Sequence, residues 1–125
     1  MPLTWMIDYD KRLVRAIAQG KLTTQDLRDY FAAVTAEGAA SYGKLFDALQ
    51  ASSFLKAEDI EAAGAMIREL TRTTPGPIGP VAVITDSPEF HVQVEFFADS
   101  AQRDRPLRIF RDEASARAWL DDKEP

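Results

Sequence analysis

Three residues have side chains and spacing that could carry acid–base chemistry: His91, Glu95 and Asp86. His91 is the one histidine of the chain, Glu95 follows it at i+4, and Asp86 lies just upstream. A histidine oriented by a carboxylate can act as a general base. Such catalysis also needs a nucleophile, and the sequence offers only scattered serines and threonines. We therefore interpret the pair as an ordinary contact between neighbours on one helix face.

Asp47 and Asp86 each follow an apolar run that is typical of a parallel strand. In open α/β sheets, ligands bind beyond the C-terminal ends of the strands, so two carboxylates at one rim could hold a metal ion or share acid–base work. Each aspartate can equally cap a helix or order a loop. We favour capping, and we expect no catalytic residue, no metal site and no cofactor.

The stronger functional signal is an apolar helix in the last third of the chain. Phe90, Val94 and Phe97 share one face of this helix, while Val92 and Phe96 lie on other sides. A helix that is apolar all round does not suit a plain surface position. Its extra side chains must enter the core, a pocket for a hydrophobic ligand, or an interface such as that of a homodimer. The sequence leaves these alternatives open, and the last two point to binding rather than catalysis.

The elements that position these residues are predicted to form an α/β domain in the order ββαβαβαβα. Two apolar runs joined by the polar break at residues 9–12 indicate an antiparallel hairpin. Each later strand alternates with a helix, which is the pattern of right-handed crossovers in a mostly parallel sheet. We expect about five strands, at residues 5–8, 13–18, 44–49, 81–85 and 107–110, and four helices, opening near residues 24, 58, 87 and 112.

The one shift in composition is segment 73–80, with three prolines and two glycines in eight residues. A domain linker there would leave units of roughly 70 and 45 residues, which are too small for good cores. We therefore expect a stiff loop inside a single domain that spans residues 1–125.

Short motifs along nearly the full length carry a family resemblance. They are Trp5-x-Ile7-Asp8, Leu13-Val14, Gly20-Lys21-Leu22-Thr23, Asp26-Leu27, Tyr42-Gly43-Lys44-Leu45-Phe46-Asp47, Glu58-Asp59-Ile60, Val81-Ala82-Val83-Ile84, Phe110-Arg111-Asp112-Glu113-Ala114 and Trp119-Leu120. With these motifs the chain resembles the SpoIIAA-like branch of the STAS superfamily, whose domains are related to bacterial anti-sigma-factor antagonists. The resemblance implies a regulatory domain that acts by protein contact. Some domains of this branch are similar to lipid-binding Sec14 domains, which implies a hydrophobic ligand as the alternative.

The resemblance also identifies one regulatory position. Antagonists of this family carry a phosphorylatable serine at the start of a helix, within an Asp-Ser-Ser-Gly motif. In this sequence Ala57 or Glu58 occupies the equivalent place, and Ser52 and Ser53 lie several residues earlier. We therefore do not expect the usual phosphoserine switch, although a glutamate there could imitate a permanently phosphorylated state.

Composition excludes several other classes of function. The chain has no cysteine and a single histidine, which removes disulfides, thiolate chemistry and histidine-cluster metal sites. Its net charge of -5 disfavours nucleic-acid binding, which needs a surplus of basic residues. No apolar run approaches the roughly 20 residues of a membrane helix, and the first residues lack the pattern of a signal peptide.

We therefore expect a cytoplasmic, non-enzymatic regulatory or protein-interaction domain that contacts a protein partner or forms a homodimer. The alternative is a small carrier or sensor of a hydrophobic, lipid-like ligand that binds under the Phe90–Phe97 helix. The residues expected at the ligand site or interface are Asp47, Asp86, Phe90, Val94, Phe96 and Phe97.

Overall fold

Five strands of the described chain form one sheet in the order β1-β2-β3-β4-β5. The computed structural model describes residues 2–53, 56–74, 76, 78–101 and 107–123. β1 is antiparallel to β2, and the other neighbouring strands are parallel. This confirms the predicted α/β class, the hairpin and the order ββαβαβαβα. The elements are β1 (Leu3–Asp8), β2 (Leu13–Lys21), α1 (Thr24–Ala36), β3 (Gly43–Ser53), α2 (Ala57–Thr73), β4 (Val81–Ile84), α3 (Pro88–Ala101), β5 (Leu107–Phe110) and α4 (Glu113–Lys123).

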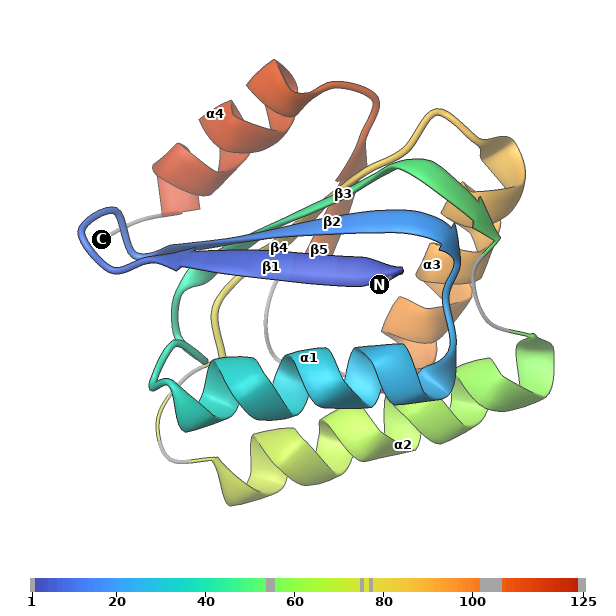
Figure 1. The fold of residues 1–125 in the computed structure, drawn as a ribbon, viewed down its shortest axis with the longest axis horizontal. Coiled ribbons are helices and arrows are strands. Elements are labelled where there is room, and N and C mark those ends of the chain that lie inside the picture. Colours follow the sequence, from blue (N-terminus) through green and yellow to red (C-terminus); the bar gives the residue numbers. More distant parts are fainter. Residues whose placement is uncertain (1, 54–55, 75, 77, 102–106, 124–125) are drawn as a thin grey trace.

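The helices cover the two faces of the sheet unequally. α1, α2 and α3 lie on one face, and α4 lies alone on the other among the described helices (Figure 1). The larger core packs the first three helices against the sheet, and a smaller core joins α4 to β3 and β4. Because α4 packs on β3, β4 and β5, the same face of β1 has exposed side chains, among them Met6.

Side-chain caps explain where three of the helices begin. Thr23 caps α1 by accepting from the backbone N–H of Asp26, and the Asp26 carboxylate accepts the N–H of Thr23 in return. Ser87 caps α3 by accepting the N–H of Phe90 at 3.2 Å. The Asp112 carboxylate accepts the N–H of Ser115 at 2.8 Å at the start of α4. These bonds satisfy N–H groups that a helix leaves without a partner in its first turn.

The prediction for the third strand is wrong in length. β3 does not end at Leu49, as predicted, but continues to Ser53, because β2 is long enough to pair with it beyond the end of β4. Between the pairs Ile17↔Asp47 and Gln19↔Gln50, β3 has one extra residue. The Asp47 carboxylate accepts the N–H of Leu49 at 3.1 Å at this irregularity. Asp47 thus stabilises a bulge inside β3, level with Ile84 at the end of β4.

The loop before β4 is held close to residues 40–44. The N–H of Gly79 donates to the Ala40 carbonyl at 2.9 Å, and the N–H of Lys44 donates to the Pro80 carbonyl at 2.8 Å. A Cβ on Gly79 would lie 2.1 Å from the Tyr42 carbonyl oxygen, so only glycine permits this approach. Among the described residues, no helix combines the length and the apolar character needed to cross a bilayer.

Candidate functional site: an apolar cavity and the two sides of α3

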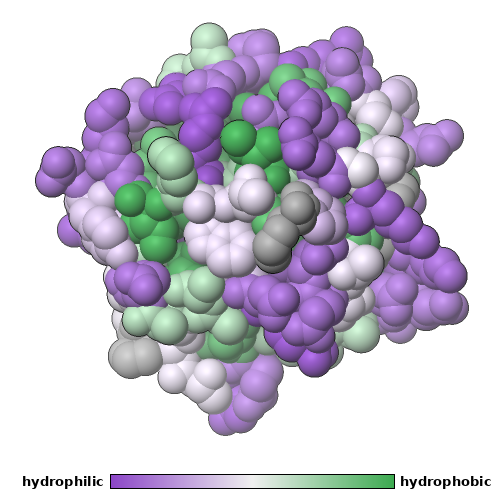
Figure 2. All heavy atoms as spheres, in the orientation of Figure 1, coloured by the Kyte–Doolittle hydropathy of each residue, from purple (hydrophilic) through white to green (hydrophobic). Residues whose placement is uncertain are grey.

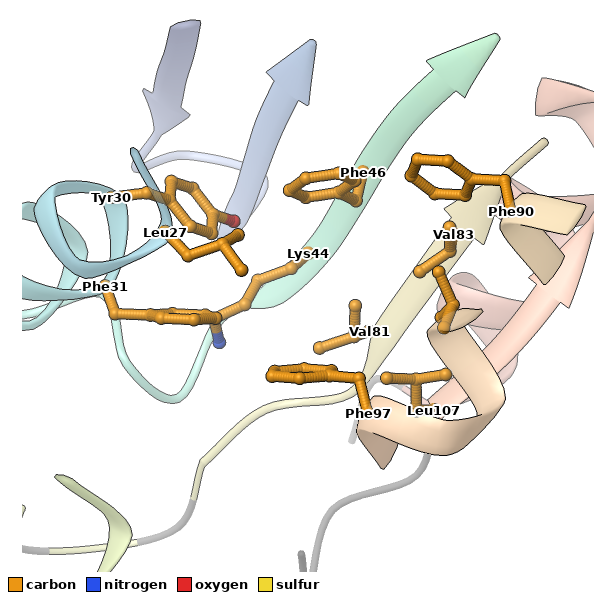
Figure 3. A pocket seen from close by; sticks show the side chains of 11 residues that line it. Leu27, Tyr30, Phe31, Lys44, Phe46, Val81, Val83, Phe90, Phe97 and Leu107 are labelled. Atoms are coloured by element: carbon orange, nitrogen blue, oxygen red, sulfur yellow. The ribbon is translucent and has the colours of Figure 1, made fainter. Parts of the chain in front are cut away.

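An apolar cavity of about 40 Å³ lies between α1, α3 and the sheet (Figure 3). α1 supplies one wall, α3 supplies the opposite wall, and β3, β4 and β5 form the floor. Its lining residues are Leu27, Tyr30, Phe31, Lys44, Phe46, Val81, Val83, Phe90, Val94, Phe97 and Leu107.

α3 contributes the three residues that the sequence placed on one helix face. Phe90, Val94 and Phe97 are all buried, and their i, i+4, i+7 spacing lines them up along the cavity. The Ser87 cap fixes the first turn of α3 and thereby the position of Phe90. In Figure 3, the rings of Phe90 and Phe97 project from α3 toward the rings of α1 across the floor of the sheet.

The wall that α1 supplies was missed by sequence reasoning. Tyr30 is buried and makes edge contacts with Trp5 at 5.5 Å and with Phe46 at 6.0 Å between ring centroids. Phe31 packs beside it at 5.2 Å. The i, i+3, i+4 spacing of Leu27, Tyr30 and Phe31 predicts a buried helix face, but no local pattern shows that this face meets α3 across a gap.

Lys44 places a cationic group at the edge of this apolar site. The residue is only 4% exposed, and its Nζ donates to the carbonyls of Ala40 at 2.6 Å and Tyr42 at 2.8 Å. The aliphatic stem lines the cavity while the nitrogen lies beside Phe31 (Figure 3). Burial of an ammonium group is tolerated when such hydrogen bonds replace those of water.

The cavity is small in this conformation. One water molecule needs about 10–15 Å³ of such volume, so about 40 Å³ corresponds to about three or four waters. A cavity that accepts benzene is about 150 Å³. An apolar ligand of ordinary size would therefore bind only after α3 or its side chains moved outward.

The outer side of α3 has a different character. Val92 is 65% exposed and Phe96 is 44% exposed, and their i, i+4 spacing places them on one surface. His91 and Glu95 lie next to them, with His91 Nε2 3.4 Å from Glu95 Oε1. Phe96 therefore faces solvent, whereas Phe97 faces the cavity, and the two phenylalanines cannot serve the same site.

Of the acid–base candidates, the structure pairs His91 with Glu95, and it shows no bond from either of them to Asp86 or Asp47 among the described residues. Asp47 follows the cavity residue Phe46 in β3, so its side chain points to the opposite face of the sheet. His91 lies on α3, and Asp86 is exposed in the loop before it. Asp47 is paired with Ile84, the last residue of β4, and Asp86 follows two residues later, so the two aspartates belong to the same end of the sheet without a bond between them. Among the described residues, no three acidic or histidine side chains gather as metal ligands would.

A charged network on the α4 face was also missed. Arg15 of β2 donates two hydrogen bonds to the Glu113 carboxylate at 3.0 and 2.5 Å, and Arg117 donates to it at 3.0 Å. The hydrogen bonds from Arg15 lower the pKa of Glu113, and the bond with Glu113 raises the pKa of Arg15. The hydrogen bond from the Ser115 backbone lowers the pKa of Asp112 in the same turn. The network anchors the start of α4 to the sheet.

Ala57 and Glu58, which the resemblance suggests as the regulatory position, lie at a helix start as the sequence predicted. α2 begins at Ala57, and Lys56 at its N-cap makes no capping bond through its side chain. Glu58 is exposed in the first turn, where a carboxylate interacts favourably with the helix dipole. Ser52 is exposed within β3 rather than at the helix start.

Comparisons with known proteins agree with this architecture. An uncharacterised protein of the DUF3478 family with a SpoIIAA-like fold, from Shewanella loihica PV-4, superposes with a TM-score of 0.61 at 18% identity, covering 94% of this chain and 93% of that one. The anti-sigma factor antagonist SpoIIAA, in its unphosphorylated form, gives a TM-score of 0.59 at 15% identity, covering 95% and 97%. No curated protein sequence matches the chain. The SpoIIAA-like family model matches residues 13–121. The chain therefore belongs to the SpoIIAA-like family.

Proposed function

We propose that the protein is a non-enzymatic regulatory domain that acts by protein contact, through the outer side of α3. The observation that carries this proposal is that α3 is apolar on two sides. Phe90, Val94 and Phe97 are buried, yet Val92 and Phe96 remain exposed. Neighbouring apolar side chains on a surface helix are typical of docking sites.

Two further observations support a binding role over an enzymatic one. No hydrogen bond or ion pair joins Asp47, Asp86 and His91 in the described part of the chain; Asp47 bonds to the N–H of Leu49 and His91 pairs with Glu95. The fold is that of an anti-sigma factor antagonist, a protein whose name describes action on another protein. We extend this mode of action to the present chain as part of the proposal.

The test is capture of partners from the source cells with three baits: the natural chain, Phe96→Ser and Leu49→Ser. Leu49 is a matched control because it is 43% exposed but lies on β3. We expect a specific partner that Phe96→Ser loses and Leu49→Ser retains. Identical partners for all three baits, or no specific partner, would contradict the proposal.

The helix start at Ala57 and Glu58 further shapes this proposal. In our proposal, binding is not switched by phosphorylation at this position, because no hydroxyl side chain stands there. Peptide-mapping mass spectrometry of the protein from its own cells should show no phosphate within residues 52–58. A phosphorylated Ser52 or Ser53 would show that the switch persists at a shifted position.

A second candidate function is the binding of a small hydrophobic ligand, and the apolar cavity is the observation that favours it. Val94→Phe should fill the cavity, whereas Val92→Phe makes the same change on the exposed side of α3. Native mass spectrometry of the natural protein should show a non-covalent adduct that Val94→Phe loses and Val92→Phe keeps. A natural protein without any adduct would leave protein contact as the function.

A further inference from the structure

β1 is an edge strand of the sheet, and no described element lies beyond it. In Figure 1 it crosses the front of the molecule. In the same orientation, Figure 2 shows hydrophobic and intermediate residues across the middle of this face, with hydrophilic residues around them. An edge of this kind is a template for pairing with another strand.

The register shows which backbone groups of β1 point outward. The N–H of Gln19 donates to the carbonyl of Pro2 at 2.7 Å, so Pro2 lies opposite Gln19 in a hydrogen-bonded pair. Such pairs alternate in an antiparallel ladder. Thr4, Met6 and Asp8 therefore bond to β2, and the N–H and carbonyl groups of Leu3, Trp5 and Ile7 face away from it.

β1 lacks the devices that usually protect an edge. It contains no proline, no lysine and no bulge, and its pairing with β2 has no register shift. Its one charged residue is Asp8, at the end. Met6 is 72% exposed on the face that α4 leaves uncovered. Prolines, lysines and bulges are the features that commonly keep natural edge strands from pairing with another chain.

We propose that two copies of this chain pair through β1, antiparallel, about a two-fold axis at Trp5. Trp5 then lies opposite Trp5 of the other copy, and Leu3 lies opposite Ile7. The outward-pointing backbone groups of Leu3, Trp5 and Ile7 then all form hydrogen bonds with the other copy. The sheet continues across the dimer.

Charge and side-chain placement favour a second copy as the occupant. In this register Asp8 lies opposite Pro2 of the other copy, so no like charges face each other. The chain has a net charge of -5, and a segment with one charge in six residues adds little to the repulsion between two copies. Met6 lies opposite Thr4 of the other copy, which covers its exposed side chain.

This inference rests on the proposed protein-interaction function and adds where self-association occurs. The dimer surface is β1, whereas the partner surface is the outer side of α3, which packs beside β4 and β5 at the cavity. The two surfaces can therefore be tested separately.

The first test is the dissociation constant of the dimer, measured by light scattering and native mass spectrometry over a dilution series. Ile7→Pro removes an outward N–H in each copy without removing a bond to β2. Ile7→Ala is its control, because it also shortens the side chain but keeps the N–H. We expect Ile7→Pro to raise the dissociation constant at least about tenfold over Ile7→Ala, since two hydrogen bonds are lost.

A second test reports the register and does not depend on proline. The chain has no cysteine, so Thr4→Cys and Met6→Cys can be made singly and then mixed. Residues 4 and 6 of opposite copies form a non-hydrogen-bonded pair with Cα atoms about 4.5 Å apart, within disulfide range. We expect the mixture to cross-link and each variant alone to cross-link far less.

The outcomes separate this inference from the proposed function. A natural protein that is monomeric at high concentration, or a mixture that does not cross-link, overturns the β1 dimer. If Phe96→Ser dissociates the dimer and Ile7→Pro does not, self-association takes place at α3. The β1 dimer is then wrong, and the proposed function still holds. If Phe96→Ser loses its partner while its dimer stays intact, both stand.

Discussion

Filling the cavity beside α3 should stabilise the protein, and its volume sets the scale. Unfilled volume in a core costs about 24 cal/mol per Å³, so about 40 Å³ corresponds to about 1 kcal/mol. Val94→Ile adds one methylene at the cavity wall and keeps a β-branched side chain on the helix. We expect the free energy of unfolding to rise by about 1 kcal/mol.

The matched control is Val92→Ile, which makes the same change on the exposed side of α3. Surface substitutions of this kind stay within about 0.5 kcal/mol. Both variants are measured by urea unfolding, with refolded protein that native mass spectrometry shows to carry no adduct, because a bound ligand shifts the apparent stability. We expect Val94→Ile to have the higher midpoint at an unchanged urea slope.

Either of two results would refute the reasoning. If Val94→Ile matches Val92→Ile, the cavity is already closed in solution and α3 sits nearer the sheet. If Val94→Ile is destabilised by 1–3 kcal/mol, as overpacked cores are, the walls cannot take even one methylene, and ligand binding there loses its basis.

Three further predictions concern α4, pH and the loop before β4. Glu113→Gln should lower the free energy of unfolding by about 1 kcal/mol, a value discounted because Glu113 is partly exposed. Glu69→Gln is the control, and it should change the free energy of unfolding little because Glu69 lies in an exposed ion pair with Arg72. Equal losses in the two variants would show that the network does not anchor α4. Because the pKa of Glu113 is lowered in the folded protein, its stabilising effect is complete above its usual pKa of about 4.5 and is lost as the pH falls through the lowered value. The free energies of unfolding of the natural protein and Glu113→Gln should therefore converge in acid. A difference between them that stays constant with pH would contradict this. Gly79→Ala should lower the free energy of unfolding by about 1–3 kcal/mol, because its Cβ would meet a backbone carbonyl. A thermal midpoint equal to that of the natural protein would show that the loop moves to accept the Cβ.

Much of the fold could be predicted because its signals are local. Thr23 with Asp26 marks a helix start, and the spacing of Phe90, Val94 and Phe97 marks a buried helix face. These patterns depend on residues within two turns of each other. The inner face of α3 was therefore predictable, although its use for a ligand remains a prediction.

What the sequence could not predict depends on contacts between distant residues. Arg15 and Glu113 are 98 positions apart, and no periodicity links them. The extension of β3 past Asp47 also depends on a neighbour, because polar residues such as Gln50 stay in the strand only where β2 pairs with them. The cavity needed α1 to be placed opposite α3, which is a property of the packed layers.

The sequential strand order has a consequence for biosynthesis. Each strand pairs only with the strands before and after it in the chain, so the sheet can grow from β1 toward β5 as the polypeptide leaves the ribosome. The β1–β2 hairpin can form first. Each later strand then adds to the strand made just before it, so none is inserted between two strands that are already in place. α4 comes last, and when Glu113 meets Arg15 it ties the final helix to a strand completed near the start of synthesis. That contact completes the fold. A chain that stops short of α4 would leave the apolar residues of the smaller core, such as Leu45, exposed, and cellular proteases would remove it.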